Sequence, residues 1–171
     1  MEIRNLKPEE IDVRIATISE KGASLLLYKD ARVDMDILDE TFGREGWMRD
    51  HKELKGNIYC GVSIWDDTKK QWITKWDAGA ESYTEKEKGE ASDSFKRACF
   101  NIGIGRELYT APFIWIPANL INMELKNGKK VTSDKFHVSA IKIENKVITG
   151  LQIINQKGIE VFILKPPTSQ G

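Results

Sequence analysis

The residues that come nearest to a phosphate-binding loop are Gly103-Ile104-Gly105-Arg106. Glycine-rich loops bind phosphate when they open a helix, because the backbone N–H groups and the helix dipole then point at the anion. Here the glycines follow an apolar helical pattern, so they predict the end of a helix. No other stretch of the chain has the pattern of a nucleotide-binding loop.

Other arrangements that could do catalysis are weak. The only histidines, His51 and His137, lie in no recognisable triad or metal-binding motif. One predicted helix carries the acidic residues Asp34, Asp36, Asp39 and Glu40. We interpret them as the solvated face of that helix, although a metal-dependent nuclease using the three aspartates is an alternative. Because no second cluster of ligands matches them, we expect no enzyme, no metal and no cofactor.

The overall charge is uninformative about partners. The 171 residues include 26 Lys+Arg and 26 Asp+Glu, which gives a formal net charge of zero. A nucleic-acid-binding protein is usually basic, but what matters is a local groove of positive potential. Any case for such a groove therefore depends on particular residues.

The cysteines and the amino terminus indicate a cytoplasmic protein. Cys60 and Cys99 are far apart and lie in apolar patterns, which predicts buried free thiols with no disulfide or zinc site. The first residues lack an apolar signal core, and no apolar run approaches the ~20 residues that span a bilayer. We expect a soluble protein of a reducing cytoplasm.

The first half of the chain predicts two helices and an antiparallel sheet. Pro8 favours a short helix near residues 6–11, and residues 25–28 have the pattern of a strand. Asp30 can cap a helix over 31–42 that Gly43 ends. Strand patterns follow at 47–53, 57–65 and 71–80, which predicts a meander with Lys69 and Lys70 in the loop before its last strand.

A long amphipathic helix follows the meander. Thr84 and Glu87 have capping-box spacing. The predicted apolar stripe consists of Ala91, Phe95, Ala98, Cys99 and Ile102. Lys96 and Arg97 lie on the two flanks of that stripe, and Phe100 points almost opposite to it.

Three further strands are predicted at 136–143, 147–154 and 159–164. The fold class is therefore α+β, with an antiparallel β-meander packed on a long helix and a further C-terminal β region. We expect a single domain over 1–165, with a core at 5–117 and a C-terminal β extension at 131–164. Residues 166–171 are expected to be a flexible tail.

Three segments in the same order resemble one known family. Gly89–Tyr109, with its Ser-Asp-Ser-Phe-Lys-Arg-Ala core, is similar to the signature helix of the Rad-fifty-two superfamily of single-strand annealing proteins, in particular its phage and bacterial members. Tyr28–Trp47 resembles the helix of that superfamily that ends in Phe-Gly-x-x-Gly-Trp. The opening Leu6–Arg14 resembles the start of these proteins, and together the likeness covers about residues 5–117.

The resemblance implies rings of subunits with single-stranded DNA in a basic groove. The groove arginine of the family falls on Arg32, and its paired Lys-Arg falls on Lys96 and Arg97. Phe100 stands where the family is often basic, so it implies either a base-stacking contact or a weaker groove. Arg106 is a further candidate that could instead interact with the last carbonyls of the helix.

Lys69 and Lys70 are a secondary candidate, with plain solubility as an equal alternative. The implied function is single-stranded DNA binding and ATP-independent annealing of complementary strands in homologous recombination and repair. The alternative is a ring-forming, end-protecting or structural DNA-binding module with little annealing activity. A single-strand binding protein, a nuclease or a recombinase could be a partner, and the role of the chain from Val131 onward stays open.

Overall fold

The computed structural model describes residues 2–80 and 86–168, and the side chains of 2–80 and 89–168. The chain forms two compact units. The meander unit comprises Ala31–Arg106 with the N-terminal residues up to Arg4, and the six-stranded unit comprises Asn5–Asp30 and the chain from Glu107 onward. The predicted α+β class with antiparallel sheets is confirmed.

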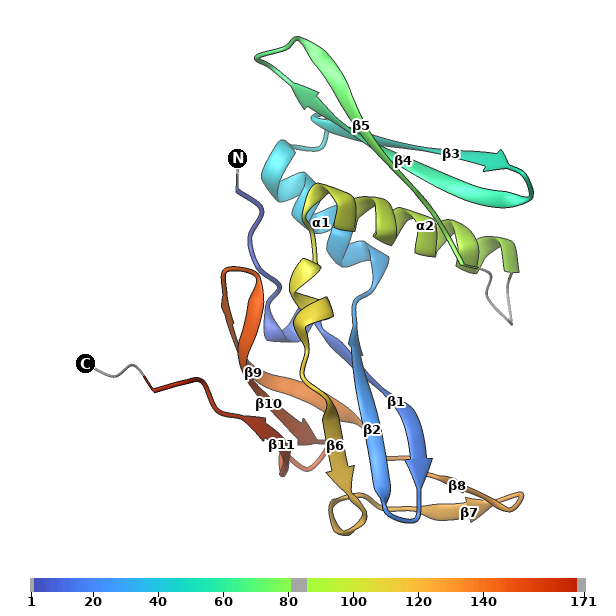
Figure 1. Ribbon diagram of the computed structural model, residues 1–171, viewed down its shortest axis with the longest axis vertical. Coiled ribbons are helices and arrows are strands. Elements are labelled where there is room, and N and C mark those ends of the chain that lie inside the picture. The colour runs from blue at the N-terminus through green and yellow to red at the C-terminus, as the bar shows by residue number, and fades with distance from the viewer. Residues whose placement is uncertain (1, 81–85, 169–171) are drawn as a thin grey trace. The chain divides into compact units, whose positions relative to one another are not determined.

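The described residues of the meander unit form two helices and three strands, as predicted. Helix α1 spans Ala31–Phe42 and is followed by β3 at Trp47–Leu54, β4 at Asn57–Asp66 and β5 at Gln71–Ala78. The three strands pair in sequence order, and the register is continuous from one end of each strand to the other. Helix α2, Lys86–Ile102, lies along one face of this sheet (Figure 1).

Helix α2 packs against the meander through Phe95, whose side chain is 1% exposed. The Trp47 ring stacks on it at a centroid distance of 6.1 Å, and the Arg49 guanidinium lies 4.7 Å from the ring centre. Ala98 and Cys99 of the predicted stripe are also buried, and Cys60 faces them from β4 as a second buried free thiol. Three residues of the predicted stripe thus lie in the core of this unit, whereas Ala91 and Ile102 are half-buried.

A capping box was predicted at the start of α2 and a glycine stop at its end. The predicted capping box of Thr84 and Glu87 lies outside the residues whose side chains the structure describes. At the other end, the Gly103 N–H donates to the carbonyls of Cys99 and Phe100 at 3.1 Å. Gly103 and Gly105 have φ angles of +122° and +72°, which favour glycine, so the predicted helix stop is confirmed.

The interpretation of the acidic residues of α1 as a solvated face was wrong for part of the cluster. Asp34 is completely buried. Asp39 is half-buried and accepts a 2.7 Å hydrogen bond from Trp47 Nε1, so it helps to fix the ring that packs on Phe95. The exposed Glu40 forms an ion pair of 2.6 Å with Arg4. Helix α1 thus uses Asp39 and Glu40 to hold neighbouring segments, a role that periodicity alone does not reveal.

The six-stranded unit combines an N-terminal hairpin with the C-terminal strands. Its strand order is β11-β10-β9-β1-β2-β6. The strands are β1 Asp12–Ser19, β2 Gly22–Tyr28, β6 Ile114–Pro117, β9 Phe136–Glu144, β10 Val147–Asn155 and β11 Glu160–Leu164. The predicted strands at 25–28, 136–143, 147–154 and 159–164 are confirmed, whereas β1 and β6 were not predicted.

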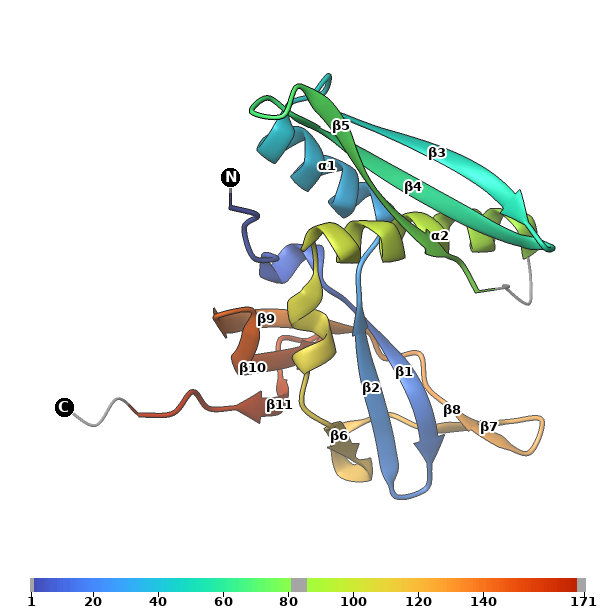
Figure 2. The same cartoon turned by 45° about the horizontal axis from the view of Figure 1, so that its top comes forward.

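The sheet of this unit curls, so that β11 and β6 at its two ends contact each other (Figure 2). A small hairpin of β7, Glu124–Lys126, and β8, Lys129–Val131, extends from it. Within residues 2–80 and 86–168 the structure also has three short 3₁₀ helices: η1 Pro8–Glu10, η2 Arg106–Thr110 and η3 Ala118–Leu120. The first is the predicted N-terminal turn. No described helix is long and apolar enough to cross a membrane.

Candidate nucleic-acid interface

Arg97 is an exposed cation that helix α2 holds against the last strand of the meander. Its Nε lies 3.5 Å from Asp77 Oδ1, with 49% of the arginine side chain and 26% of the aspartate side chain exposed. Asn101 Nδ2 donates to the other Asp77 oxygen at 3.2 Å and to the Trp76 carbonyl at 3.1 Å. Asp77 therefore orients Arg97 and partly neutralises it.

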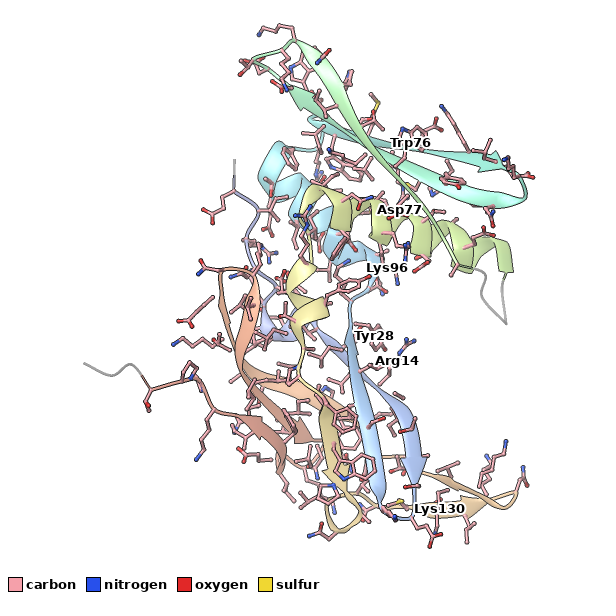
Figure 3. All side chains as sticks on the ribbon, in the orientation of Figure 1. Arg14, Tyr28, Trp76, Asp77, Lys96 and Lys130 are labelled. Carbon is pink, nitrogen blue, oxygen red and sulfur yellow. The ribbon has the colours of Figure 1, made fainter. Side chains whose placement is uncertain are left out.

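The register of the meander explains why Asp77 meets α2. Asp77 pairs with Cys60 across β4 and β5, and Cys60 is buried on the helix-facing side. Trp76, one residue earlier, points to the opposite face because side chains alternate along a strand (Figure 3). Asp77 was not among the predicted site residues, because its proximity to Arg97 depends on how α2 packs against β5.

Lys96 is the neighbouring cation and is half-buried on α2. Among the described residues, no carboxylate lies within ion-pair distance of its amino group. Its charge is thus less compensated than that of Arg97. An ammonium group with this freedom suits a phosphate oxygen, which accepts hydrogen bonds from any direction.

Arg106 covers the end of α2. Its Nε donates to the Phe100 carbonyl at 2.8 Å and its Nη2 donates to the Asn101 carbonyl at 2.9 Å. The guanidinium carbon lies 5.6 Å from the centre of the half-buried Phe100 ring. Of the two roles considered for Arg106, the interaction with the last carbonyls is present in the structure. Because Arg106 is exposed, its contact with phosphate stays a prediction.

Arg32 lies in the first turn of α1 and is exposed. Helix α1 contacts α2 within the same unit. Four of the candidates, Arg32, Lys96, Arg97 and Phe100, therefore belong to two helices that pack on each other. Arg106 follows α2 as the first residue of η2 and belongs to the same compact unit. Their assignment to a single groove remains a prediction.

Lys69 and Lys70 occupy the turn between β4 and β5, as expected, but they are compensated locally. Lys69 lies 3.5 Å from Asp66, and Lys70 lies 2.8 Å from Asp67. The backbone N–H of Lys69 and its nearby charge lower the pKa of Asp66, which keeps that partner ionised. Asp77 lies seven positions after Lys70 along the extended strand, roughly 23 Å away at ~3.3 Å per residue. The structure thus places these lysines apart from Arg97.

The order of helices and strands and the pair of cations on α2 agree with the family that the sequence resembles. A model of the Rad52/22 family of double-strand break repair proteins matches residues 3–127. The chain belongs to the Rad52/22 family. No curated protein sequence matches it closely enough to add to this assignment.

Membership of the Rad52/22 family places the chain in the repair of DNA double-strand breaks. The match includes both helices, the meander, the β1–β2 hairpin and β6, and it ends in the turn of the β7–β8 hairpin. Strands β9, β10 and β11 lie beyond it. They nevertheless complete the same sheet as β1 and β2, so they are structurally part of the six-stranded unit.

The face of the meander that points away from α2 exposes large apolar side chains. Its exposed apolar side chains are Met48, Leu54, Trp65, Trp72 and Trp76, with exposed fractions of 39–58%. We call these residues the outer meander face. Trp65 and Trp72 meet edge to face at 5.5 Å, and Lys52 Nζ lies 4.7 Å from the Trp76 ring centre. Large exposed apolar patches of this kind mark surfaces that contact another protein.

Proposed function

We propose that this Rad52/22 chain binds single-stranded DNA through its backbone and anneals complementary strands without ATP and without a covalent step. The observation that carries the proposal is the adjacent pair of cations on α2. Lys96 has no ion-pair partner among the described residues, and Arg97 is exposed beside a single half-buried carboxylate. Both side chains can reach a phosphate without rearrangement of the buried stripe beneath them.

Contacts of this type suit annealing for a physical reason. Lysine and arginine bind phosphate oxygens, which carry no sequence information, so a strand of any sequence can be held. The bases then stay free to test a second strand for complementarity. Phe100 adds an aromatic ring beside the cations, and a base can stack on such a ring with little preference for sequence.

We propose further that the chain assembles with copies of itself, in a ring. The outer meander face supports this, because burying its three tryptophans against a second copy would remove a large apolar area from water. Repetition of a weak phosphate site around an assembly raises the overall affinity, since each further contact is intramolecular once the first has formed.

The direct test is a salt titration of binding to oligo-dT by the wild type and by Lys96→Ala/Arg97→Ala. For single strands the slope of log affinity against log salt is about −0.7 per phosphate neutralised, so losing two contacts should flatten it by roughly 1.4 per subunit bound. Lys69→Ala/Lys70→Ala is the matched control, because it removes the same charge at a site that is already compensated. Wild-type affinity and slope in the α2 variant would contradict the assignment.

Light scattering and thermal unfolding keep this test interpretable. Surface substitutions away from caps and core usually change stability by about ±0.5 kcal/mol, so the α2 variant should unfold and assemble like the wild type. Failure of the variant to assemble would show that the pair is an interface ion pair. A wild type that is a monomer with and without DNA would contradict the proposed ring.

A further inference from the structure

The sheet of the six-stranded unit opens between β1 and β9. These strands are neighbours in the sheet, yet they pair through a single residue pair, Asp12 with His137. Beyond that pair they diverge and leave a cleft of about 430 Å³. One wall is formed by residues 11–15 with Tyr28, and the other by Thr132 and residues 134–137. The whole cleft lies within one compact unit.

Arg14 is held in this cleft in a defined position. Its guanidinium carbon lies 5.3 Å from the centre of the Tyr28 ring, on the neighbouring strand (Figure 3). Leu26 is its partner across β1 and β2, so Arg14 and the exposed Tyr28 share the outer face of the hairpin. Stacking on an aromatic ring leaves the edge of a guanidinium and its N–H donors free, the geometry with which arginine binds phosphate.

The opposite wall brings further cations. Lys135 is exposed there, and strand β8, which leads into this wall, contacts β1 and carries Lys129 and Lys130. Within the described part of the chain, no carboxylate lies within ion-pair distance of Arg14 or of these three lysines. The turn Asn127-Gly128 has positive φ at both residues, which fixes a tight hairpin beneath the two β8 lysines.

Asp134, one of the two carboxylates that line the cleft, forms no ion pair with the cations of the cleft. Asp134 is buried and accepts hydrogen bonds from the Asn122 backbone N–H and from Gln156 Nε2, each at 2.8 Å. Its charge is therefore stabilised by neutral donors and makes no ion pair with the cations of the cleft. Asp12 is the other acid of the lining, so the lining itself has two carboxylates and two cations, Arg14 and Lys135. Lys129 and Lys130 of the neighbouring β8 add the surplus of positive charge.

We propose that this cleft is a second contact for the phosphate backbone of single-stranded nucleic acid, with Arg14 and Lys135 as phosphate ligands and Tyr28 as the positioning residue for Arg14. The inference deepens the proposed function and rests on it. An acidic peptide is the competing ligand that the same charges would attract.

The experiment is a salt titration of oligo-dT binding by four forms of the full chain: the wild type, Arg14→Ala/Lys135→Ala, Lys96→Ala/Arg97→Ala and a control, Lys157→Ala/Lys165→Ala. The control removes two exposed lysines of the same unit that lie outside the cleft. We expect the cleft variant to flatten the slope of log affinity against log salt by roughly 1.4, the value for two lost phosphates, and the control to leave it unchanged.

Two further variants separate positioning from charge. Tyr28→Phe keeps the ring under Arg14 and should bind like the wild type, whereas Tyr28→Leu removes the ring and should weaken binding. Both keep the charge of the chain, so a purely electrostatic role of the cleft would leave both at wild-type affinity and would overturn the positioning role. Thermal unfolding checks that each variant is folded.

The outcomes distinguish the two proposals. If only the Lys96/Arg97 variant flattens the slope, the cleft is not a contact and the proposed function stands. If only the Arg14/Lys135 variant flattens it, the cleft is supported and the α2 site is wrong. A wild type that does not bind oligo-dT overturns both. If poly-L-glutamate binds as tightly as oligo-dT with the same dependence on Arg14 and Lys135, the cleft is a peptide site and the inference is overturned.

Discussion

Replacing Asp77 with asparagine should increase the affinity for single-stranded DNA, because Asp77 competes with phosphate for Arg97. The pair is separated by 3.5 Å and is substantially exposed, with 49% of the arginine side chain accessible. Exposed ion pairs contribute about 0.2–1 kcal/mol. Releasing this energy on binding corresponds to a gain in affinity of roughly 1.4- to 5-fold per contact, since ~1.4 kcal/mol is a factor of ten.

The substitution has a predictable cost in stability. Asparagine keeps an oxygen that can accept from the Ala78 N–H, but it cannot both keep that bond and accept from Asn101 Nδ2 with its other terminal atom. Loss of one such hydrogen bond lowers the free energy of unfolding by about 0.5–1.5 kcal/mol. Urea unfolding should show this decrease while assembly is retained.

The assay is fluorescence anisotropy with labelled oligo-dT at several salt concentrations. The matched control is Asp67→Asn, which changes the net charge equally but pairs with Lys70 at the hairpin turn. The reasoning predicts a larger gain for Asp77→Asn than for Asp67→Asn. Equal gains would mean that only overall charge matters, and an unchanged or lower affinity in a folded Asp77→Asn protein would refute the placement of Arg97 at the DNA.

Three further predictions concern the fold. In Gly22→Ala, at φ +151°, the new Cβ would overlap the Ile116 carbonyl oxygen. In the control Gly56→Ala the φ is +80° and no atom lies near the new Cβ, so we expect the free energy of unfolding to fall by only ~1–2 kcal/mol. The loss measured by urea unfolding should be larger in Gly22→Ala. Burial raises the pKa of the Cys60 thiol to about 11, so a thiol reagent at mildly alkaline pH should label Cys60 only after unfolding, and rapid labelling of the folded protein would contradict its burial. Burial raises the pKa of Asp134, but hydrogen bonds from Asn122 and Gln156 outweigh this effect and lower the pKa in the folded protein. Ionised Asp134 therefore stabilises the fold above the pKa of the unfolded state, about 3.9. This contribution is lost as the pH falls through the lower pKa of the folded state. Urea unfolding between about pH 6 and pH 3 should therefore lose less stability in Asp134→Asn than in the wild type, and parallel losses would contradict the prediction.

Much of the fold could be predicted because its elements carry regular local patterns. The apolar stripe around Phe95 defines α2, and Gly103 marks its end. Strand β1 was missed for a physical reason. A bulge between Ile15 and Thr17 shifts the register, so the apolar positions Val13, Ile15 and Ile18 do not keep a period of two. Strand β6 has four residues and is defined only by its pairing with a strand far away in the sequence.

The residues of the candidate site also divide into those that a local sequence pattern identifies and those that only the packing of distant segments brings together. Lys96 and Arg97 could be identified because they lie in a recognisable helix motif. Asp77 could not be assigned to Arg97, since their proximity depends on the packing of α2 against the meander. The cleft of Arg14 and Lys135 required knowledge that the C-terminal strands join the sheet of the N-terminal hairpin, a pairing between residues more than a hundred positions apart.

The most direct measurement of the central claim is the rate at which complementary fluorescent oligonucleotides anneal in the absence of any nucleotide cofactor. The proposed function predicts that the wild type accelerates annealing over the uncatalysed rate for unrelated sequences alike. Lys96→Ala/Arg97→Ala should lose most of that acceleration, and Lys69→Ala/Lys70→Ala should lose less. Tight binding of single strands by the wild type with no acceleration would contradict annealing and identify an end-protecting or structural module instead.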